Sequence, residues 1–201
     1  LFMSDNGGLS AEPAWRDGEL HTQNAPLNSG KGSAYEGGIR EPMIVKWPGV
    51  TAAGTICEKP LIIEDFYPTI LEMAGIKQYK TVQKIDGVSF MPLLNHTGDP
   101  SEGREFYWNF PNLWGNTGPG IGATATIRKG DWKLIYYYES GRKELFNIRE
   151  DIGETRNCEE QYPKLVKKLS KRLGNYLRKV KAQRPAYKAT ASPVPWPDEV
   201  R

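Results

Sequence analysis

Cysteine is scarce in this sequence, which has only Cys57 and Cys158 among its 201 residues. The two lie about a hundred positions apart, and this excludes a disulfide framework and a CxxC metal or redox site. Long apolar runs are also missing, since none approaches the ~18 residues that a membrane helix needs. The opening LFMSDNGG lacks the basic-then-apolar pattern of a signal peptide. We therefore expect a chain that neither spans a membrane nor carries its own targeting signal.

The composition is otherwise ordinary for a globular protein. Hydrophobic residues make up 38% and charged residues 25%, while 21 glycines and 15 prolines indicate a loop-rich body, so coiled coils and collagen-like chains are excluded. The net charge is +3, but residues 162–184 hold nine basic residues and no acidic one. The remainder is therefore mildly acidic, and the basic character of one segment does not indicate a surface made for nucleic acid.

The first half of the sequence predicts short strands, a long loop and a helix. Residues 1–4 form an apolar run that stops at a turn cluster, which is typical of a buried strand ending in a loop. Residues 9–41 are polar and glycine-rich without a period, and loops of that length are usually functional or disordered. A second strand is expected at residues 43–47, and a helix over residues 61–74 that ends at Gly75.

The second half has a different pattern, after a polar, turn-forming stretch at residues 95–103 where we place a domain boundary. Short β-type runs joined by tight turns predict an antiparallel meander, with strands at 106–108, 123–129, 132–138 and 144–146. An apolar stripe predicts a helix over residues 163–183 that packs on the meander; its members are Leu165, Val166, Leu169, Leu173, Tyr176, Leu177 and Val180. The proline-rich tail that follows cannot be regular.

Two adjacent residues after the first predicted strand could bind a metal ion. Asp5 offers a carboxylate and Asn6 an amide carbonyl, which are hard oxygen donors that suit Ca²⁺ or Mg²⁺. Calcium takes ~6 to 8 oxygens, so most ligands would come from elsewhere in the chain or from sequence outside it. The alternative is an ordinary Asx turn, because Asp-Asn-Gly-Gly forms turns in many settings.

The sequence Gly30-Lys31-Gly32 places a cation between two glycines. A compact oxyanion could approach both the ammonium group and neighbouring backbone N–H groups, whereas a flexible loop lysine is the alternative. A Walker loop is excluded, because it would need glycine at position 25 and serine or threonine at position 32, where this chain has alanine and glycine. Shortly afterwards, Glu36 and Arg40 are expected to form a structural ion pair.

Three further candidates lie in the long loop. Trp15, Arg16 and His21 could stack on and hydrogen-bond a polar ligand, with an ordinary surface or structural role as the alternative for the histidine. The lysine-rich face of the last predicted helix is most simply a solvated face, and contact with a polyanion is the alternative.

Several motifs, in this order, resemble the type I, formylglycine-dependent sulfatases. They are SDNGG at 4–8, NAPL at 24–27, GKG at 30–32, YEGGIREP at 35–42 and WPG at 47–49. The later stretches IRKGDWKL at 127–134, ELFN at 144–147 and DIGET at 151–155 resemble the C-terminal subdomain of the same family, in particular its bacterial polysaccharide-degrading members. The resemblance extends from the first residue to about residue 180.

The resemblance implies a fold and a set of roles. The fold is an alkaline-phosphatase-like α/β fold, incomplete in this chain, followed by an α+β C-terminal subdomain with a small antiparallel sheet and a packed C-terminal helix. Asp5 and Asn6 match the family's calcium ligands, and Lys31 matches the lysine that binds the sulfate group. In such enzymes a formylglycine made from cysteine or serine attacks sulfur as its hydrated geminal diol, while the metal and the lysine stabilise charge on the sulfuryl oxygens.

The nucleophile motif of the family, Cys or Ser followed by x-P-x-R, is absent from these 201 residues. We therefore expect the C-terminal part of a sulfatase that is inactive alone, with residues 1–95 from the catalytic domain and residues 96–201 as the C-terminal subdomain. The implied substrate is a sulfated carbohydrate or an aryl sulfate, and the implied location is periplasmic or secreted. Neither nucleic acid nor a membrane is an expected partner, and the oligomeric state is open.

Two alternatives to a sulfatase stay open. A phosphodiester or phosphonate ester hydrolase of the same superfamily would share the metal-bound oxyanion chemistry. A non-catalytic module could instead hold a sulfated polyanion with its long loop and its basic last helix.

Overall fold

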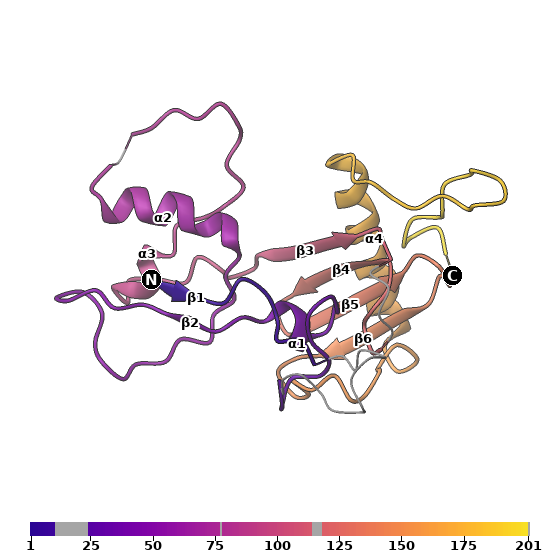
Figure 1. Cartoon of the computed structure of the whole chain (residues 1–201), viewed down its shortest axis with the longest axis horizontal. Coiled ribbons are helices and arrows are strands. Elements are labelled where there is room, and N and C mark those ends of the chain that lie inside the picture. Colours follow the sequence, from indigo (N-terminus) through magenta and orange to yellow (C-terminus); the bar gives the residue numbers. More distant parts are fainter. Residues whose placement is uncertain (11–23, 77, 114–117, 201) are drawn as a thin grey trace. The chain divides into compact units, whose positions relative to one another are not determined.

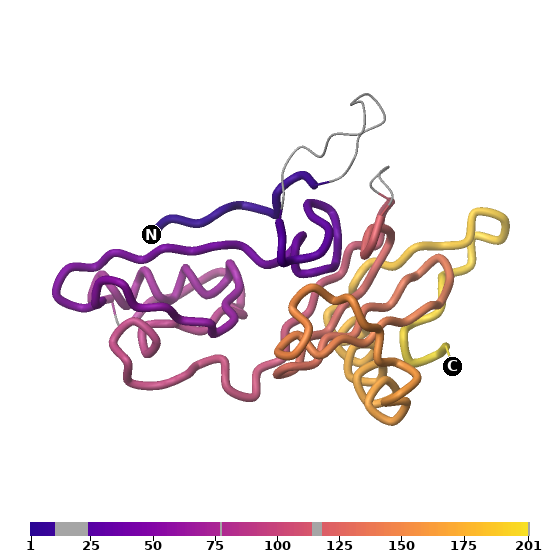
Figure 2. Tube along the Cα trace, turned by 90° about the horizontal axis from the view of Figure 1, so that it is seen from below, coloured from indigo at the N-terminus to yellow at the C-terminus, as the bar shows by residue number. Residues whose placement is uncertain are grey.

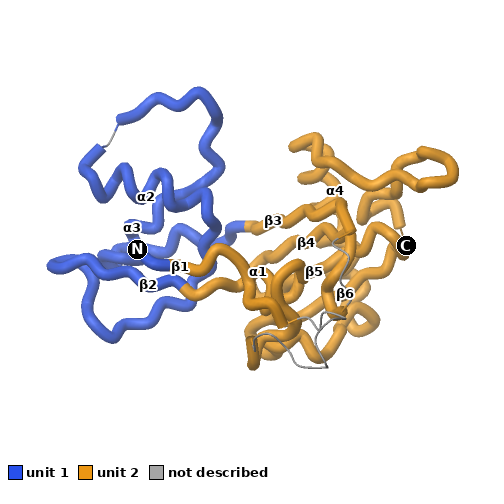
Figure 3. Tube along the Cα trace, viewed as in Figure 1, with its two compact units in different colours: residues 1–2, 43–104 blue, residues 3–42, 105–201 orange. Residues whose placement is uncertain are grey.

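The computed structural model describes residues 1–10, 24–76, 78–113 and 118–200, and it divides into two compact units (Figure 1, Figure 3). Unit 1 comprises residues 1–2 and 43–104, and unit 2 comprises residues 3–42 and 105–201. The units differ from the two predicted domains, because residues 3–42 group with the C-terminal half of the chain. The predicted division at residue 95 concerns the intact enzyme and stays a prediction.

Most of the short elements of the first half lie in unit 1. They are β1 (Phe2–Met3), which pairs with β2 (Met43–Ile44), a 3₁₀ turn η1 (Ile63–Asp65), α2 (Phe66–Met73) and α3 (Met91–Leu94). Both predicted strands are present but only two residues long, and no third strand pairs with them among the residues that the structure describes. The helix predicted over residues 61–74 is also present but begins later, at Phe66.

A buried ion pair holds the start of α2. The Asp65 carboxylate is 0% exposed and accepts two hydrogen bonds from the Arg104 guanidinium, each at 2.8 Å. The same carboxylate accepts hydrogen bonds from the backbone N–H groups of Ile62 at 3.0 Å and Val88 at 2.8 Å. The start of the helix is therefore set by tertiary contacts to one carboxylate, which the helical pattern of the sequence does not contain.

Unit 2 is a four-stranded antiparallel meander covered by one helix. Its strands follow in chain order as β3 (Glu105–Phe110), β4 (Thr124–Lys129), β5 (Trp132–Tyr137) and β6 (Lys143–Asn147). All four predicted strands are confirmed. Between β4 and β5 the turn places Gly130 at φ +58°, a conformation that glycine adopts without strain.

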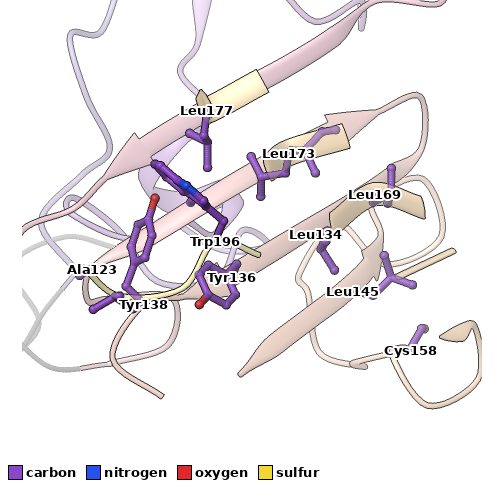
Figure 4. Packing of buried hydrophobic residues seen from close by; sticks show 13 residues of the cluster. Ala123, Leu134, Tyr136, Tyr138, Leu145, Cys158, Leu169, Leu173, Leu177 and Trp196 are labelled. Carbon is purple, nitrogen blue, oxygen red and sulfur yellow. The ribbon is translucent and has the colours of Figure 1, made fainter. Parts of the chain in front are cut away.

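The helix α4 (Pro163–Lys179) packs on one face of this sheet (Figure 4). Leu169, Leu173 and Leu177 are at most 1% exposed and belong to one cluster with buried side chains of β4, β5 and β6. The small antiparallel sheet with a packed C-terminal helix is thus confirmed. Within the described part of the chain, no helix has the length and apolarity that crossing a membrane requires.

The chain leaves α4 through a left-handed residue and returns along the sheet. Lys181 has φ +52°, so the predicted helix end at residue 183 is wrong: α4 stops at Lys179. Val180, which the stripe placed in the core, is 48% exposed. The proline-rich tail (yellow in Figure 2) forms no helix, as expected, but Val194 and Trp196 are buried in the same cluster as the leucines of α4.

Candidate functional site

The turn at residues 5–8 presents the two predicted metal ligands. Asp5 is exposed and Asn6 is half-buried. The Asn6 amide donates a hydrogen bond from Nδ2 to Asp5 Oδ2 at 2.5 Å, and Ser4 Oγ donates to the Asn6 carbonyl at 2.9 Å. Within the described residues this leaves Asp5 Oδ1 and Asn6 Oδ1 without a hydrogen bond. The turn therefore keeps two hard oxygen atoms open.

Lys31 lies in a loop that packs directly on this turn. Its backbone N–H donates a hydrogen bond to the Gly8 carbonyl at 3.0 Å. A Cβ atom on Gly30 would lie 2.3 Å from the same carbonyl oxygen, so only glycine permits this approach. The Lys31 side chain is exposed, and its ammonium forms no ion pair with any residue that the structure describes. The predicted sulfate-binding lysine and the predicted metal ligands thus stand on adjoining backbone segments.

The side-chain amide of Asn24 ties these segments together. Its Nδ2 atom donates hydrogen bonds to the carbonyls of Ser29 at 2.9 Å and Gly8 at 3.0 Å, with a longer one to the carbonyl of Gly37 at 3.4 Å. Two amide protons therefore serve three backbone carbonyls from three separate segments. One polar side chain therefore links the 5–8 turn, the Lys31 loop and α1.

The short helix α1 (Glu36–Ile39) interrupts the long predicted loop and packs through its glycines. A Cβ atom on Gly37 would lie 2.3 Å from the Asn28 carbonyl oxygen, and one on Gly38 would lie 2.2 Å from the Ser33 carbonyl oxygen. Any residue other than glycine at these two positions would clash with a carbonyl oxygen of the neighbouring backbone. The sequence EGGI is thus a packing motif as well as a helical turn.

Glu36, the first residue of α1, enters a buried charge cluster on the meander. Lys133 Nζ on β5 lies 3.0 Å from Glu36 Oε1 and 2.8 Å from Glu154 Oε1, and all three side chains are at most 2% exposed. Glu154 Oε2 accepts a hydrogen bond from the Glu36 backbone N–H at 2.5 Å. Arg128 and Arg40 approach Glu36 Oε2 at 3.5 and 3.7 Å, which confirms the predicted pair of Glu36 with Arg40. Burial raises the pKa of Glu154 to about 7, although the Lys133 ammonium acts in the opposite direction.

A pocket of about 220 Å³ opens beside the turn and α1. Its lining includes Gly7, Asn24, Arg40 and Glu41. Burial raises the pKa of the Glu41 carboxyl, and the nearby charge of Asp5 adds to this effect. The lining of the pocket therefore includes one cationic and one carboxyl side chain.

Some of the predicted site cannot be placed, and one part of it is incomplete. Trp15, Arg16 and His21 lie outside the described residues. Across the described ranges, no three or more His, Cys, Asp and Glu side chains are grouped to hold a metal ion. Asp5 and Asn6 have the oxygen chemistry that Ca²⁺ prefers, so they fit a calcium ion as part of a larger ligand set.

Sequence reasoning missed the roles of Asn24, Lys133 and Glu154. All three lie inside motifs that carry the family resemblance, namely NAPL, IRKGDWKL and DIGET. The motifs marked the positions without showing what the side chains contact. Lys133 in particular reads as an outward-facing residue of a strand, whereas its side chain is 0% exposed.

The motifs agree with similarity to known proteins. The sequence signature of the family described as N-sulphoglucosamine sulphohydrolase, C-terminal, matches residues 30–181. The chain belongs to this sulfatase family. A sulfatase from Formosa agariphila is 32% identical over 98% of the chain. The crystal structure of Ps i-CgsB in complex with k-i-k-neocarrahexaose matches 92% of the chain with a TM-score of 0.71 and 29% identity. A further structure, solved in complex with its substrate D-glucosamine-2-N,6-O-disulfate, matches 73% with a TM-score of 0.58 and 26% identity.

The sulfatase chain spans about a third of the length of these relatives. It covers 36% of the Formosa sulfatase, 37% of Ps i-CgsB and 30% of the third protein. The likeness shows the alkaline-phosphatase-like fold class that the sequence resemblance implied. Sulfatases of this kind generally use a metal ion and a formylglycine.

Proposed function

We propose that the intact protein hydrolyses sulfate esters, and that Asp5, Asn6 and Lys31 are this chain's share of its active site. The observation that supports this most is the joining of the two loops, because the Lys31 backbone N–H bonds to Gly8 at 3.0 Å. Two oxygen ligands for a hard cation and an ammonium group without an ion pair among the described residues thereby occupy adjoining segments. Negative charge on sulfuryl oxygens is stabilised by such a pair of positive centres.

Each residue has a distinct role in the proposed site. Asp5 Oδ1 and Asn6 Oδ1 would supply part of the coordination of a calcium ion, which when bound polarises the sulfate oxygens. The Lys31 ammonium binds the sulfate group and stays fixed as charge develops, because its loop is hydrogen-bonded to the turn. The nucleophile comes from outside these 201 residues, so the chain is inactive by itself.

The proposed substrate is a sulfated carbohydrate. Two structural relatives are solved with carbohydrates, one of them the disulfated glucosamine that is its substrate. In this chain the pocket beside α1 offers Arg40 and Glu41, groups that hydrogen-bond sugar hydroxyls and sulfate oxygens. A periplasmic or secreted location belongs to the same proposal, because polymeric sulfated carbohydrates lie outside the cytoplasm.

The experiment uses the intact enzyme, produced with its formylglycine and assayed on an aryl sulfate, a sulfated oligosaccharide and an aryl phosphodiester. We expect turnover of the sulfate esters and a loss of about 10²–10³ in kcat for Lys31→Ala. Asp5→Asn should raise the calcium concentration that restores activity after chelation. Lys46→Ala is the matched control, because Lys46 is exposed and forms no ion pair within the described ranges.

Two results would contradict this proposal, one for the reaction and one for the role of Lys31. One is faster turnover of the phosphodiester than of the aryl sulfate, which would favour a phosphate ester hydrolase on the same fold. The other is an equal effect of Lys31→Ala and Lys46→Ala, which would remove Lys31 from the site.

A further inference from the structure

We propose that Lys133 and Glu154 are positioning residues of the candidate active site: from β5 and from the loop after β6 they hold α1 and, through it, the Lys31 loop. An effect of these residues on catalysis rests on the proposed function, whereas the contacts that support the proposal lie within this chain. Among the described residues, neither one forms a hydrogen bond or ion pair with Lys31 or with the 5–8 turn. Their effect on the site is therefore indirect and passes through Glu36.

The ion pairs of the charge cluster are buried too deeply to behave as surface salt bridges. Lys133 and Glu154 are 0% exposed, and Glu36 is 2% exposed. Lys133 is the single cation within 4.0 Å of the Glu154 carboxylate in the described part of the chain. An unpaired charge in such surroundings is strongly unfavourable, so each member requires the others. Both the side chain and the backbone N–H of Glu36 are held in this way.

Close contacts between backbones link α1 to the 5–8 turn and to the Lys31 loop. Asn24 Nδ2 lies 3.4 Å from the Gly37 carbonyl oxygen, and a Cβ atom on Gly7 would lie 2.2 Å from that oxygen. A Cβ atom on Gly38 would lie 2.5 Å from the Gly30 carbonyl oxygen. Backbone atoms packed this closely have no rotamers with which to absorb a shift. A displaced α1 therefore displaces both the 5–8 turn and the Lys31 loop.

The stability of the packed position of α1 depends on pH near neutrality. Burial raises the pKa of Glu154 from its usual 4.5 to about 7. The charged and titratable groups that face this carboxylate are Lys133 of β5, Glu36 and Arg40 of the α1 segment, Arg128 of β4, which reaches it through Glu36, and Tyr35. Because the buried site favours the protonated form, opening of α1 becomes easier as the pH rises from 4.5 to about 7. A glutamine at position 154 would stay neutral and keep an oxygen acceptor for the Glu36 N–H.

Hydrogen exchange on the intact protein tests this coupling without a measurement of activity. The reporters are the amides of Lys31 and Gly37, which bond to carbonyls within the loops, and the reference is the amide of Tyr138, which bonds to the Ala123 carbonyl at 2.9 Å. We expect Lys133→Met to accelerate exchange at both reporters by about tenfold or more, with the reference unchanged.

Two further substitutions make the comparison specific. Glu154→Ala should accelerate the reporters as Lys133→Met does, whereas Glu154→Gln should restore protection and abolish its pH dependence between pH 5 and about 7. The matched control is Lys129→Met, which removes a lysine of the same sheet that pairs with Glu105 at 2.6 Å and forms no hydrogen bond or ion pair with α1 in the described structure. It should leave both reporters unchanged.

Several outcomes would overturn the proposal. Equal acceleration at reporters and reference would show general destabilisation, and unchanged exchange at Lys31 would show that α1 does not position its loop. If Lys133→Met does not fold, the contrast between Glu154→Ala and Glu154→Gln decides the question. In the intact enzyme, Lys133→Met should lower kcat by about tenfold or more with a smaller change in KM. An unsubstituted enzyme that hydrolyses no sulfate ester would refute the proposed function and leave the exchange result to decide the positioning role.

Discussion

The Asn24 side chain can be changed in a way that preserves its shape and reverses its hydrogen bonding. In Asn24→Asp, both amide protons are lost and a carboxylate oxygen takes the place of Nδ2. That oxygen would face the carbonyls of Ser29 and Gly8 at 2.9 and 3.0 Å, with the carbonyl of Gly37 at 3.4 Å. The attraction between the Asn24 amide and the three carbonyl oxygens is thereby replaced by repulsion between oxygen atoms.

The magnitude follows from these contacts. Two neutral hydrogen bonds are lost, each with a net contribution of about 0.5–1.5 kcal/mol. The carboxylate also faces three carbonyl dipoles in a half-buried position, which adds about 1–2 kcal/mol. We expect the free energy of unfolding to fall by about 3 kcal/mol at pH 7. Protonation removes the repulsion and lets the carboxyl donate one hydrogen bond, so about 2 kcal/mol should be regained below pH ~4.

Urea unfolding followed by circular dichroism measures this change, because the meander and α4 provide most of the regular structure. With an m value of about 2 kcal/mol/M, the transition midpoint should fall by about 1.5 M at pH 7. Asn28→Asp is the matched control: it makes the same chemical change in the same loop, and the Asn28 side chain has no hydrogen bond within the described ranges. Equal shifts in the two variants, or a difference that does not narrow in acid, would refute the reasoning.

Three further predictions concern single contacts in the two units. Because the folded-state pKa of Glu154 is raised from 4.5 to about 7, the unsubstituted chain should lose stability as the pH rises through this interval, and Glu154→Gln should lose less; parallel melting curves against pH would contradict this. Gly37→Ala should lower the melting temperature far more than Gly98→Ala, since the added Cβ meets backbone at 2.3 Å in the first and only a side chain at 3.7 Å in the second. Arg104→Lys replaces the two hydrogen bonds from the guanidinium to the buried Asp65 carboxylate by a single ammonium charge. It should lower the free energy of unfolding, measured with denaturant, by about 1–3 kcal/mol, and an unchanged value would show that the paired hydrogen bonds are not needed.

The meander and α4 were predictable because their signals are local. A tight turn, such as the one at Gly130, depends on residues that are close in sequence. The same is true of an apolar stripe at helical spacing. The end of α4 was not, because Val180 fits the apolar stripe and only the left-handed Lys181 shows that the chain reverses there. The packing of Trp196 on the core was not predictable either, since prolines on both sides indicate only irregular structure.

The organisation of the candidate site was predictable only through family resemblance. Its loops pack through glycines and one asparagine, so they have no hydrophobic period from which an arrangement could be read. Lys133 and Glu36 are 97 positions apart in the sequence, and nothing local indicates that they form a buried pair. The metal and sulfate roles of Asp5, Asn6 and Lys31 stay predictions.

Unit 2 is assembled from residues far apart in the order of synthesis. The Tyr35 hydroxyl donates to Glu144 Oε2 at 2.9 Å across 109 positions, and Val194 and Trp196 complete the cluster on α4. At about 5–20 residues per second, a ribosome adds these last core residues roughly ten seconds or more after the Lys31 loop. Until Lys133, Glu144 and Glu154 have been made, Tyr35 and α1 lack their partners in unit 2, because long-range contacts form only after the intervening chain exists. The loop with the proposed chemistry is made early and ordered late, and during that interval it is exposed to proteases and available to chaperones.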